Sequence, residues 1–428
     1  MGKLLGTAFS FCFLVVGSAL AQIYGPNAVE VDYEYTSSFA PNYGDPRSEV
    51  GSWTGLDFVH DHANHVFGIL TSEKLRQKFR LDPSVIGGLG GPRRSEDSTI
   101  RFNGRRGDKV LTYSLRGKMI LHKKVAASWL RAGKATLPLP HDMSSLYRPE
   151  CTDEHYTSLG DYWYFYDPFR EGCEALSTEP VAQLVEVRIR PQRARRLDLN
   201  PRLDLVRGDN GNGALFLIYT VTGFEASSTD PADLGLQNFK TINRRLASLG
   251  FTDESTHLTR NRPLHIFRKT VRDRAGKEVN LEIRRLLAET GANENNLSFA
   301  KFLKEAVENA DVFAYDGHSG LGANLDLGYL QSLSGPFQFR PRRRQIFFFD
   351  SCSSYSYYLT QFAAAKTNAT IDVMTNGLSS LFNTAASVHN AFFDTLLDFS
   401  KDPAWPTILR NMEKPLGGST YLLNVGAL

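Results

Sequence analysis

The sequence predicts an α/β fold in its C-terminal half: a doubly wound, mostly parallel sheet with helices on both faces. A mostly β or α+β N-terminal domain is expected before it. After residue 213, continuous apolar runs of strand length alternate with amphipathic segments, as in sheets covered by helices on both faces. Before residue 209, short runs alternate polar with apolar residues and are separated by Gly, Pro and Asp, which is typical of half-buried strands.

Length and composition are consistent with this division. A chain of 428 residues is longer than one ordinary domain, so two folded units are expected. The 42% hydrophobic and 22% charged residues are typical of a globular protein, and a formal net charge of +3 does not indicate a nucleic-acid partner. We expect a signal peptide at 1–21, an N-terminal domain of unknown role at 22–210 and a second domain at 211–428.

The signal peptide is predicted from the first residues. Lys3 precedes an apolar run, residues 4–20, that ends in Ala19-Leu20-Ala21, a small-residue cleavage site. Cleavage after Ala21 would give an exported protein, secreted or periplasmic. The alternative, a retained membrane anchor, is disfavoured because the run is short and interrupted by Gly and Ser. No stable membrane anchor is expected.

Export determines how the cysteines are interpreted. Without the signal peptide the chain keeps Cys151, Cys173 and Cys352. In an oxidising compartment one pair is expected to close, and Cys151 and Cys173, which bracket a short aromatic segment, are the natural pair. Cys352 then remains as a thiol. Its neighbours, which include Asp350 and three serines, are polar, which favours a reactive cysteine over a buried structural one.

In the N-terminal half, residues 22–50 are expected to form an extended arm or edge strand. Residues 56–79 have the apolar spacing of a helix and end before Asp82-Pro83. Alternating runs predict strands at 109–115, 118–123 and 181–190, with one or two helices among them. The junction to the second domain is placed in the Gly- and Asn-rich stretch 209–213.

The predicted helix carries three histidines, His60, His62 and His65. Their spacing is that of the metal-binding signature of metallo-beta-lactamase-like hydrolases. Imidazoles this close can bind zinc only where a loop turns them inward, but here the flanks are helical. Asn64 also stands where a carboxylate is expected, and no downstream ligand set accompanies the motif. A structural role is therefore favoured, and we expect neither a metal nor a cofactor.

In the C-terminal half, continuous apolar runs predict buried strands, and the amphipathic segments between them begin or end at Pro, Ser and Gly as helices do. A turn at 274–276 predicts that two of the strands pair directly. The expected strands are 214–221, 264–271, 278–286, 312–315, 345–349, 371–374 and 421–425, and the expected helices are 230–249, 298–309, 325–333, 384–399 and 407–412.

Two of these strands deliver reactive residues at their carboxyl ends. The run 311–315 leads into Asp316-Gly317-His318-Ser319-Gly320, and the run 345–349 leads into Asp350-Ser351-Cys352. The carboxyl ends of neighbouring parallel strands lie on one edge of the sheet, where catalytic groups gather. The sequence therefore predicts that His318 and Cys352 form a catalytic pair.

The pair of motifs resembles that of the caspase-like cysteine peptidases (clan CD). The triplet Asp350-Ser351-Cys352 is most like that of metacaspases, and the short spacing from His318 to Cys352 is more like that of the gingipains. The resemblance covers residues 213–428 and implies a caspase-like sheet with a Cys-His dyad that needs no strict third member. The family usually has Gly directly after the histidine, whereas this chain has Ser319.

These motifs suggest the following roles. Cys352 supplies the nucleophile and His318 the proton for the leaving amine, while backbone N–H groups at Ser319, Gly320 and Cys352 bind the oxyanion. Asp350 either lines the pocket for the substrate residue before the cut, as in metacaspases and with a preference for Arg or Lys, or caps the turn. Asp316 is a candidate second carboxylate of that pocket.

We therefore expect an exported cysteine endopeptidase that acts on peptides or proteins. One alternative is a catalytically silent caspase-like fold that serves as a binding module. The other is a metal-dependent hydrolase centred on His60, His62 and His65.

Overall fold

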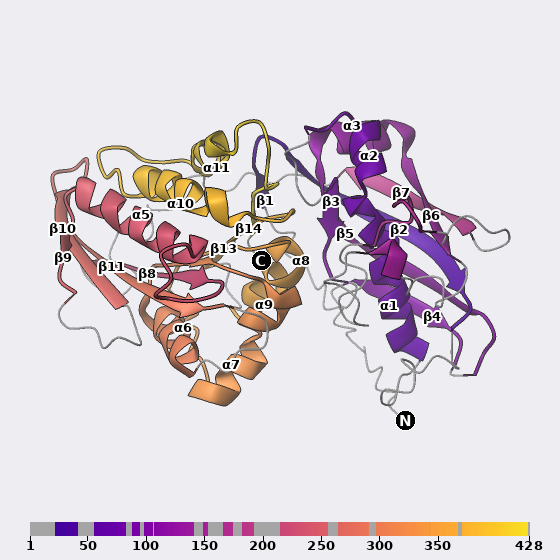
Figure 1. The fold of residues 1–428 in the computed structure, drawn as a ribbon, viewed down its shortest axis with the longest axis horizontal. Helices are drawn as coiled ribbons and strands as arrows, with labels where there is room; N and C mark the ends of the chain where they lie inside the picture. The colour runs from indigo at the N-terminus through magenta and orange to yellow at the C-terminus, as the bar shows by residue number, and fades with distance from the viewer. Residues whose placement is uncertain are drawn as a thin grey trace, which may run out of the picture.

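The computed structural model describes two β-sheets with their covering helices, which lie side by side (Figure 1). The residues it describes are 22–41, 55–82, 88–94, 98–105, 107–140, 149–152, 166–173, 182–191, 215–255, 264–290, 297–341, 343–366 and 370–426. The predicted signal peptide, residues 1–21, lies outside these ranges. None of the helices within them combines the length and the hydropathy that a membrane span requires.

The first sheet is antiparallel and has six strands, in the order β3-β5-β2-β7-β6 with β4 also paired to β5. In chain order the strands are β2 (Ala28–Phe39), β3 (Gly90–Pro92), β4 (Thr99–Asn103), β5 (Leu111–His122), β6 (Lys134–Pro140) and β7 (Ala182–Pro191). The expected edge strand is β2, an interior strand between β5 and β7, so that expectation was wrong. The two expected strands at 109–115 and 118–123 are one long strand, β5.

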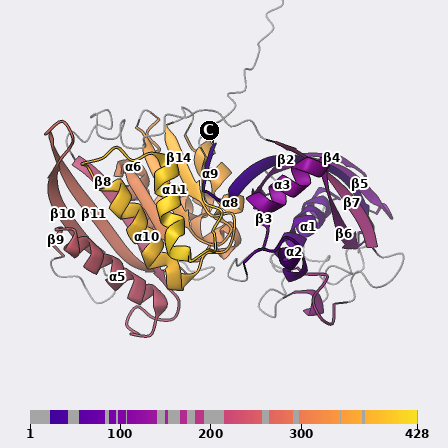
Figure 2. The ribbon, with the colours of Figure 1, turned by 90° about the horizontal axis from the view of Figure 1, so that it is seen from above.

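Helices cover one face of this sheet, which makes the N-terminal unit an α+β domain (Figure 2). They are α1 (Gly55–Gly68), η2 (Ile69–Thr71), α2 (Glu73–Lys78) and α3 (Lys123–Ala132), with a short turn η5 (Pro149–Cys151). The single helix expected at 56–79 is divided because Ser72 leaves the helical conformation. Its side chain accepts a hydrogen bond from the backbone N–H of Leu75 and so caps α2.

The predicted disulfide between Cys151 and Cys173 is confirmed. Cys151 is fully buried in the core of the first domain, and its carbonyl oxygen accepts a hydrogen bond from the backbone N–H of Asp167. The bridge therefore ties the segment around residue 167 to this core.

Replacing both Cys151 and Cys173 by Ala is expected to lower the free energy of unfolding by about 3 kcal/mol, because the open loop regains conformational entropy in the unfolded chain. Urea unfolding of the double variant and the parent measures the difference. Reductant should bring the parent to the stability of the variant and leave the variant unchanged. Equal free energies of unfolding of the parent and the variant without reductant would contradict a stabilising role of the disulfide.

The second sheet has nine strands in the order β1-β15-β14-β13-β12-β8-β11-β10-β9. Its five central strands, from β14 to β11, are parallel, and antiparallel strands flank them on both sides, so the sheet is mixed. In chain order the strands are β1 (Gln22–Tyr24), β8 (Leu215–Phe224), β9 (Thr252–Asp253), β10 (Leu264–Arg272), β11 (Glu278–Glu289), β12 (Val312–Asp316), β13 (Gln345–Asp350), β14 (Ile371–Thr375) and β15 (Asn424–Gly426).

Helices cover both faces of this sheet, as expected (Figure 2). On one face lie α5 (Leu234–Ser248), α10 (Phe382–Leu396) and α11 (Trp405–Glu413). On the other lie α6 (Leu297–Asn309), α7 (Leu327–Ser334), α8 (Ser354–Tyr357) and α9 (Leu359–Ala364). Strand β13 is apolar on both faces and therefore needs both layers of helices. Phe348 packs on the side of α5, α10 and α11, whereas Phe347 and Phe349 pack on the side of α6 to α9.

The first strand of the chain belongs to the second sheet. Residues 22–24 form β1, which pairs antiparallel with β15, so the expected domain range 22–210 is wrong for these residues. The alternation of the region could not reveal this, because the pairing is made with residues 424–426 at the other end of the sequence. The N-terminal arm thus connects both sheets.

Candidate functional site

His318 follows the carboxyl end of β12 in a turn that is held by its backbone. The carbonyl oxygen of His318 accepts hydrogen bonds from the Tyr315 hydroxyl at 2.6 Å and the Asn324 amide at 2.9 Å. Gly317 is needed beside it, because a Cβ atom there would lie 2.7 Å from the Thr290 hydroxyl. The imidazole itself is 43% exposed, and its ring contacts the edge of Phe382.

Cys352 follows the carboxyl end of β13 in a tight turn. The next residue, Ser353, has φ +50°, a left-handed conformation that costs a non-glycine residue about 1 kcal/mol and that is concentrated at functional sites. Its backbone N–H donates to the carbonyl oxygen of Leu378, and the Cys352 thiol, which is partly exposed, donates to the carbonyl oxygen of Ser380 at 3.6 Å. The loop after β14 therefore holds the turn that carries the thiol.

The sheet register brings the two motifs to one place. Strands β12 and β13 pair in parallel with Asp316 opposite Asp350, so His318 and Cys352 each stand two residues beyond a paired position. The backbone N–H of Gly317 also donates to the carbonyl oxygen of Asp350. Both reactive residues then contact the same short segment, Ser380 to Phe382. The register and these contacts therefore place the turns of His318 and Cys352 at the same edge of the sheet.

The structure adds a residue that sequence reasoning missed. Glu225 lies just past the end of β8, the strand next to β12, and its Oε1 atom lies 3.8 Å from Nε2 of His318. Its backbone N–H donates to the Asp233 carboxylate, which also caps α5, so the position of the residue is anchored. A carboxylate beside an imidazole can orient the ring.

If His318 acts in peptide hydrolysis as the sequence predicts, Glu225→Gln is expected to lower kcat/KM about threefold to fivefold with little change in KM, since the half-exposed pair contributes no more than about 1 kcal/mol. Glu225→Asp should recover part of the loss if the carboxylate orients the imidazole. Steady-state kinetics on one peptide substrate, with thermal unfolding as the control for folding, measures both. A loss that appears only in KM would assign Glu225 to substrate binding instead.

The two candidate oxyanion residues begin the short helix η7 (Gly320–Leu325). Ser319, which stands where the family usually has Gly, is buried with φ −80° and ψ −25°, a conformation that needs no glycine. The left-handed position lies one residue later, at Gly320, where φ is +53°. The carbonyl oxygen of Ser319 accepts a hydrogen bond from the Tyr358 hydroxyl, which fixes the turn from the side of α9.

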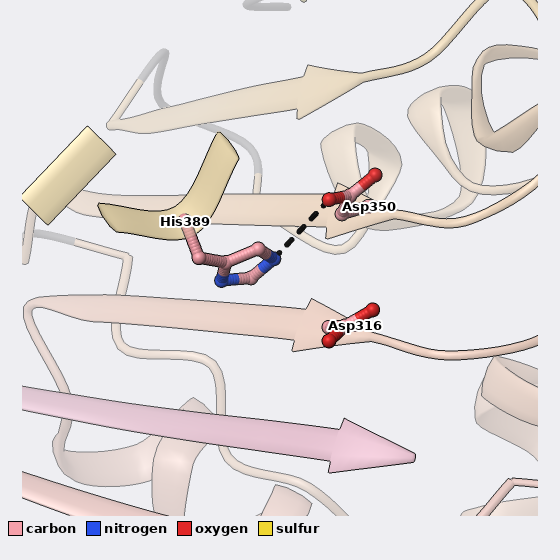
Figure 3. Close-up of side chains that lie close together, drawn as sticks. All are labelled: Asp316, Asp350 and His389. Atoms are coloured by element: carbon pink, nitrogen blue, oxygen red, sulfur yellow. Dashed lines mark ion pairs between the residues drawn. The ribbon is translucent and has the colours of Figure 1, made fainter. Parts of the chain in front are cut away.

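Asp316 and Asp350 lie beneath the surface. Their side chains point into the layer covered by α10, where His389 faces them (Figure 3). Asp350 accepts a hydrogen bond from the side-chain amide of Asn376 at 2.8 Å, and its Oδ2 atom lies 3.3 Å from Nε2 of His389. The pKa of Asp316 is raised to about 7, chiefly because the carboxyl group is buried; the charge of Asp350 adds to the rise, while His389 and Arg285 oppose it.

The buried position of Asp350 is relevant to its two predicted roles, lining a substrate pocket or capping the turn. The carboxylate is buried, and its hydrogen bond comes from the side chain of Asn376 rather than from a backbone N–H group of a turn. The backbone of Asp350 does bind the histidine turn, through its carbonyl oxygen. Asp316 is equally deep, so neither carboxylate stands at the surface where a substrate side chain first arrives.

The N-terminal domain contacts the helix that follows the thiol. Glu30 of β2 is buried and accepts a hydrogen bond at 2.5 Å from the hydroxyl of Tyr355, which stands three residues after Cys352. Arg93 donates to the same carboxylate at 3.1 Å. Burial and the neighbouring Glu30 carboxylate raise the pKa of Tyr355 well above its usual value, so the hydroxyl remains a donor. The hydroxyl of Ser356 adds a bond to the backbone of Pro92.

The histidines of the first domain lie elsewhere. His62 is fully buried, its Nδ1 atom lies 2.8 Å from the Tyr113 hydroxyl, and its ring stacks on Phe39. These contacts favour the structural interpretation of this residue. The side chain of His65 lies outside the described part of the structure.

Neither a protein-family model nor a curated protein matches the sequence.

Proposed function

We propose that the protein is an exported, caspase-like cysteine endopeptidase that uses Cys352 and His318. The observation that supports this most directly is the register of β12 and β13, which sets both residues just beyond paired strand ends at one loop. The strained turn at Ser353 and the five parallel central strands fit the same proposal. The Cys151–Cys173 disulfide fits export, because such bonds persist in oxidising compartments.

In the proposed reaction, the thiolate of Cys352 attacks the carbonyl carbon of the peptide bond. The C–N bond breaks, and the protonated imidazole of His318 gives its proton to the leaving amine. Water then hydrolyses the thioester and regenerates the thiol. Glu225, whose Oε1 atom lies 3.8 Å from Nε2 of His318, positions the imidazole. Backbone N–H groups at Ser319, Gly320 and Cys352 are the proposed donors to the oxyanion.

A peptide acyloxymethyl ketone probe tests this proposal. The thiolate of an active cysteine peptidase displaces the carboxylate of the probe and forms a stable thioether, so mass spectrometry should find the probe on Cys352 alone. We expect labelling of the folded protein at least about 100 times faster than in urea, and slower labelling of His318→Ala.

Probes with Arg, Lys, Asp or Glu next to the reactive group would reveal which side chain the site prefers. A folded protein whose Cys352 reacts no faster than in urea would instead be a caspase-like binding module.

A further inference from the structure

The buried group formed by Asp316, Asp350 and His389 has the composition and geometry of a metal centre. The three come from β12, β13 and α10, and their potential ligand atoms all lie within 4.8 Å of one another. Figure 3 shows the imidazole turned toward the two carboxylates at the ends of their strands. Among the described residues, these three side chains form a group whose ligand atoms lie close enough together to hold one ion.

The atoms that would bind a metal lack hydrogen bonds. Oδ2 of Asp316, Oδ2 of Asp350 and Nε2 of His389 have no hydrogen-bond partner, although each residue is at most 3% exposed. His389 Nε2 and Asp350 Oδ2 are 3.3 Å apart, yet their orientation does not make a hydrogen bond. Buried polar atoms without partners are costly and call for an explanation, of which a bound ion is one.

The charges around these three side chains also favour a bound cation. Arg285 interacts electrostatically with Asp316, but its guanidinium donates hydrogen bonds to Asn243 and Thr222 rather than to either carboxylate. Two carboxylates buried together repel each other, and a cation between them removes this repulsion. The amide of Asn376 holds the other oxygen of Asp350, as an outer hydrogen bond commonly orients a metal-binding carboxylate.

The ligand types identify the metal class. An imidazole nitrogen favours Zn²⁺ and similar transition metals over Mg²⁺ or Ca²⁺, and carboxylate oxygens complete such sites. Zn–O and Zn–N bonds of about 2.0–2.2 Å place tetrahedral ligands about 3.5 Å apart. The separation of 3.3 Å between His389 and Asp350 is close to that spacing.

We propose that Asp316, Asp350 and His389 bind one divalent transition metal ion of the Zn²⁺ class, which joins the ends of β12 and β13 to α10. Each carboxylate stands two residues before a residue of the catalytic pair, so the metal fixes both turns from below. The site is structural, and it does not depend on the proposed peptidase activity.

The metal content of the full-length Cys352→Ala protein tests the proposal. This variant has no thiol near the three ligands that could bind the metal instead, and the measurement does not require peptidase activity. After incubation with Zn²⁺ and dialysis, elemental analysis should give about one equivalent of zinc per chain. Asp316→Asn, Asp350→Asn and His389→Asn in this background should each reduce it at least tenfold. Co²⁺ in place of Zn²⁺ should give a visible d–d spectrum in Cys352→Ala that the three variants lack.

His265→Ala is the matched control. His265 forms an exposed pair with Asp253 at 2.9 Å, so it has the same two side-chain types without a third ligand. This variant should keep its zinc. Thermal unfolding adds a second readout: Zn²⁺ at about 100 times its Kd should raise the Tm of Cys352→Ala by about 3 °C, with no effect on Asp350→Asn.

Three results would overturn the proposal. Zinc below about 0.1 equivalents in folded Cys352→Ala would mean that the carboxylates are compensated by protons instead. Equal zinc in Cys352→Ala and Asp350→Asn would place the metal elsewhere. A metal-free active protein in which Asp350→Asn abolishes only cleavage after Arg would assign the cluster to substrate recognition.

Discussion

Replacing Cys352 by Ala is expected to lower kcat for peptide hydrolysis by at least about 10⁴-fold, because nothing else in the site can form the thioester. Replacing His318 by Ala is expected to cost about 10²- to 10⁴-fold, the usual contribution of a general acid or base. The two losses should not add in the double variant, since both residues serve one step. Hydrolysis of peptides with basic and acidic residues before the cut measures all three proteins.

The control for these variants is binding. Cys352→Ala should still bind the best substrate with an affinity close to the KM of the parent, because the thiol contributes little to ground-state binding. Hydrolysis by Cys352→Ala at the rate of the parent would show that another residue is the nucleophile. That result would remove the proposed function but leave the metal proposal intact.

Replacing the buried Glu30 by Ala is expected to lower the free energy of unfolding by about 3–5 kcal/mol, because it leaves Arg93, whose side chain is only 14% exposed, without its carboxylate partner. It also removes the acceptor of the Tyr355 hydroxyl, three residues after the thiol. The helix α8 then loses a contact to the first domain, and we expect labelling of Cys352 by the peptide probe to slow about tenfold. Urea unfolding and labelling kinetics measure the two effects separately.

Glu34→Ala is the control on the same strand. Glu34 is partly exposed and pairs with Arg116 at 3.2 Å on the surface, so its loss should change stability by no more than about 1 kcal/mol and leave labelling unchanged. If Glu30→Ala and Glu34→Ala behave alike, the contact between the domains does not position the nucleophile.

The strands and helices of the second sheet were largely predictable because each is a local pattern. The run 345–349 is apolar on both faces, which only a covered central strand requires, and β13 has that form. The interior position of β2 was not predictable. Alternation indicates one buried face but does not reveal how many strands lie on either side.

For the candidate site, the sequence indicated only the residues that stand at strand ends. His318 and Cys352 follow buried runs directly, so their positions could be inferred from one local rule. Glu225 and His389 carry no such signal: the first looks like any loop carboxylate, and the second lies in the apolar pattern of α10. Glu30 and Tyr355 are 325 residues apart, and no local pattern could join them.

The pairing of β1 with β15 affects how the protein is made. The partner of residues 22–24, residues 424–426, is synthesised about 400 residues after them, which takes roughly 20–80 s at the usual rate of about 5–20 residues per second. Until then β1 has no partner in its own sheet. Without β15, strand β14 is the unpaired edge of that sheet. Chaperones that shield strand edges should therefore matter most for this protein before β15 has paired with β1 and β14.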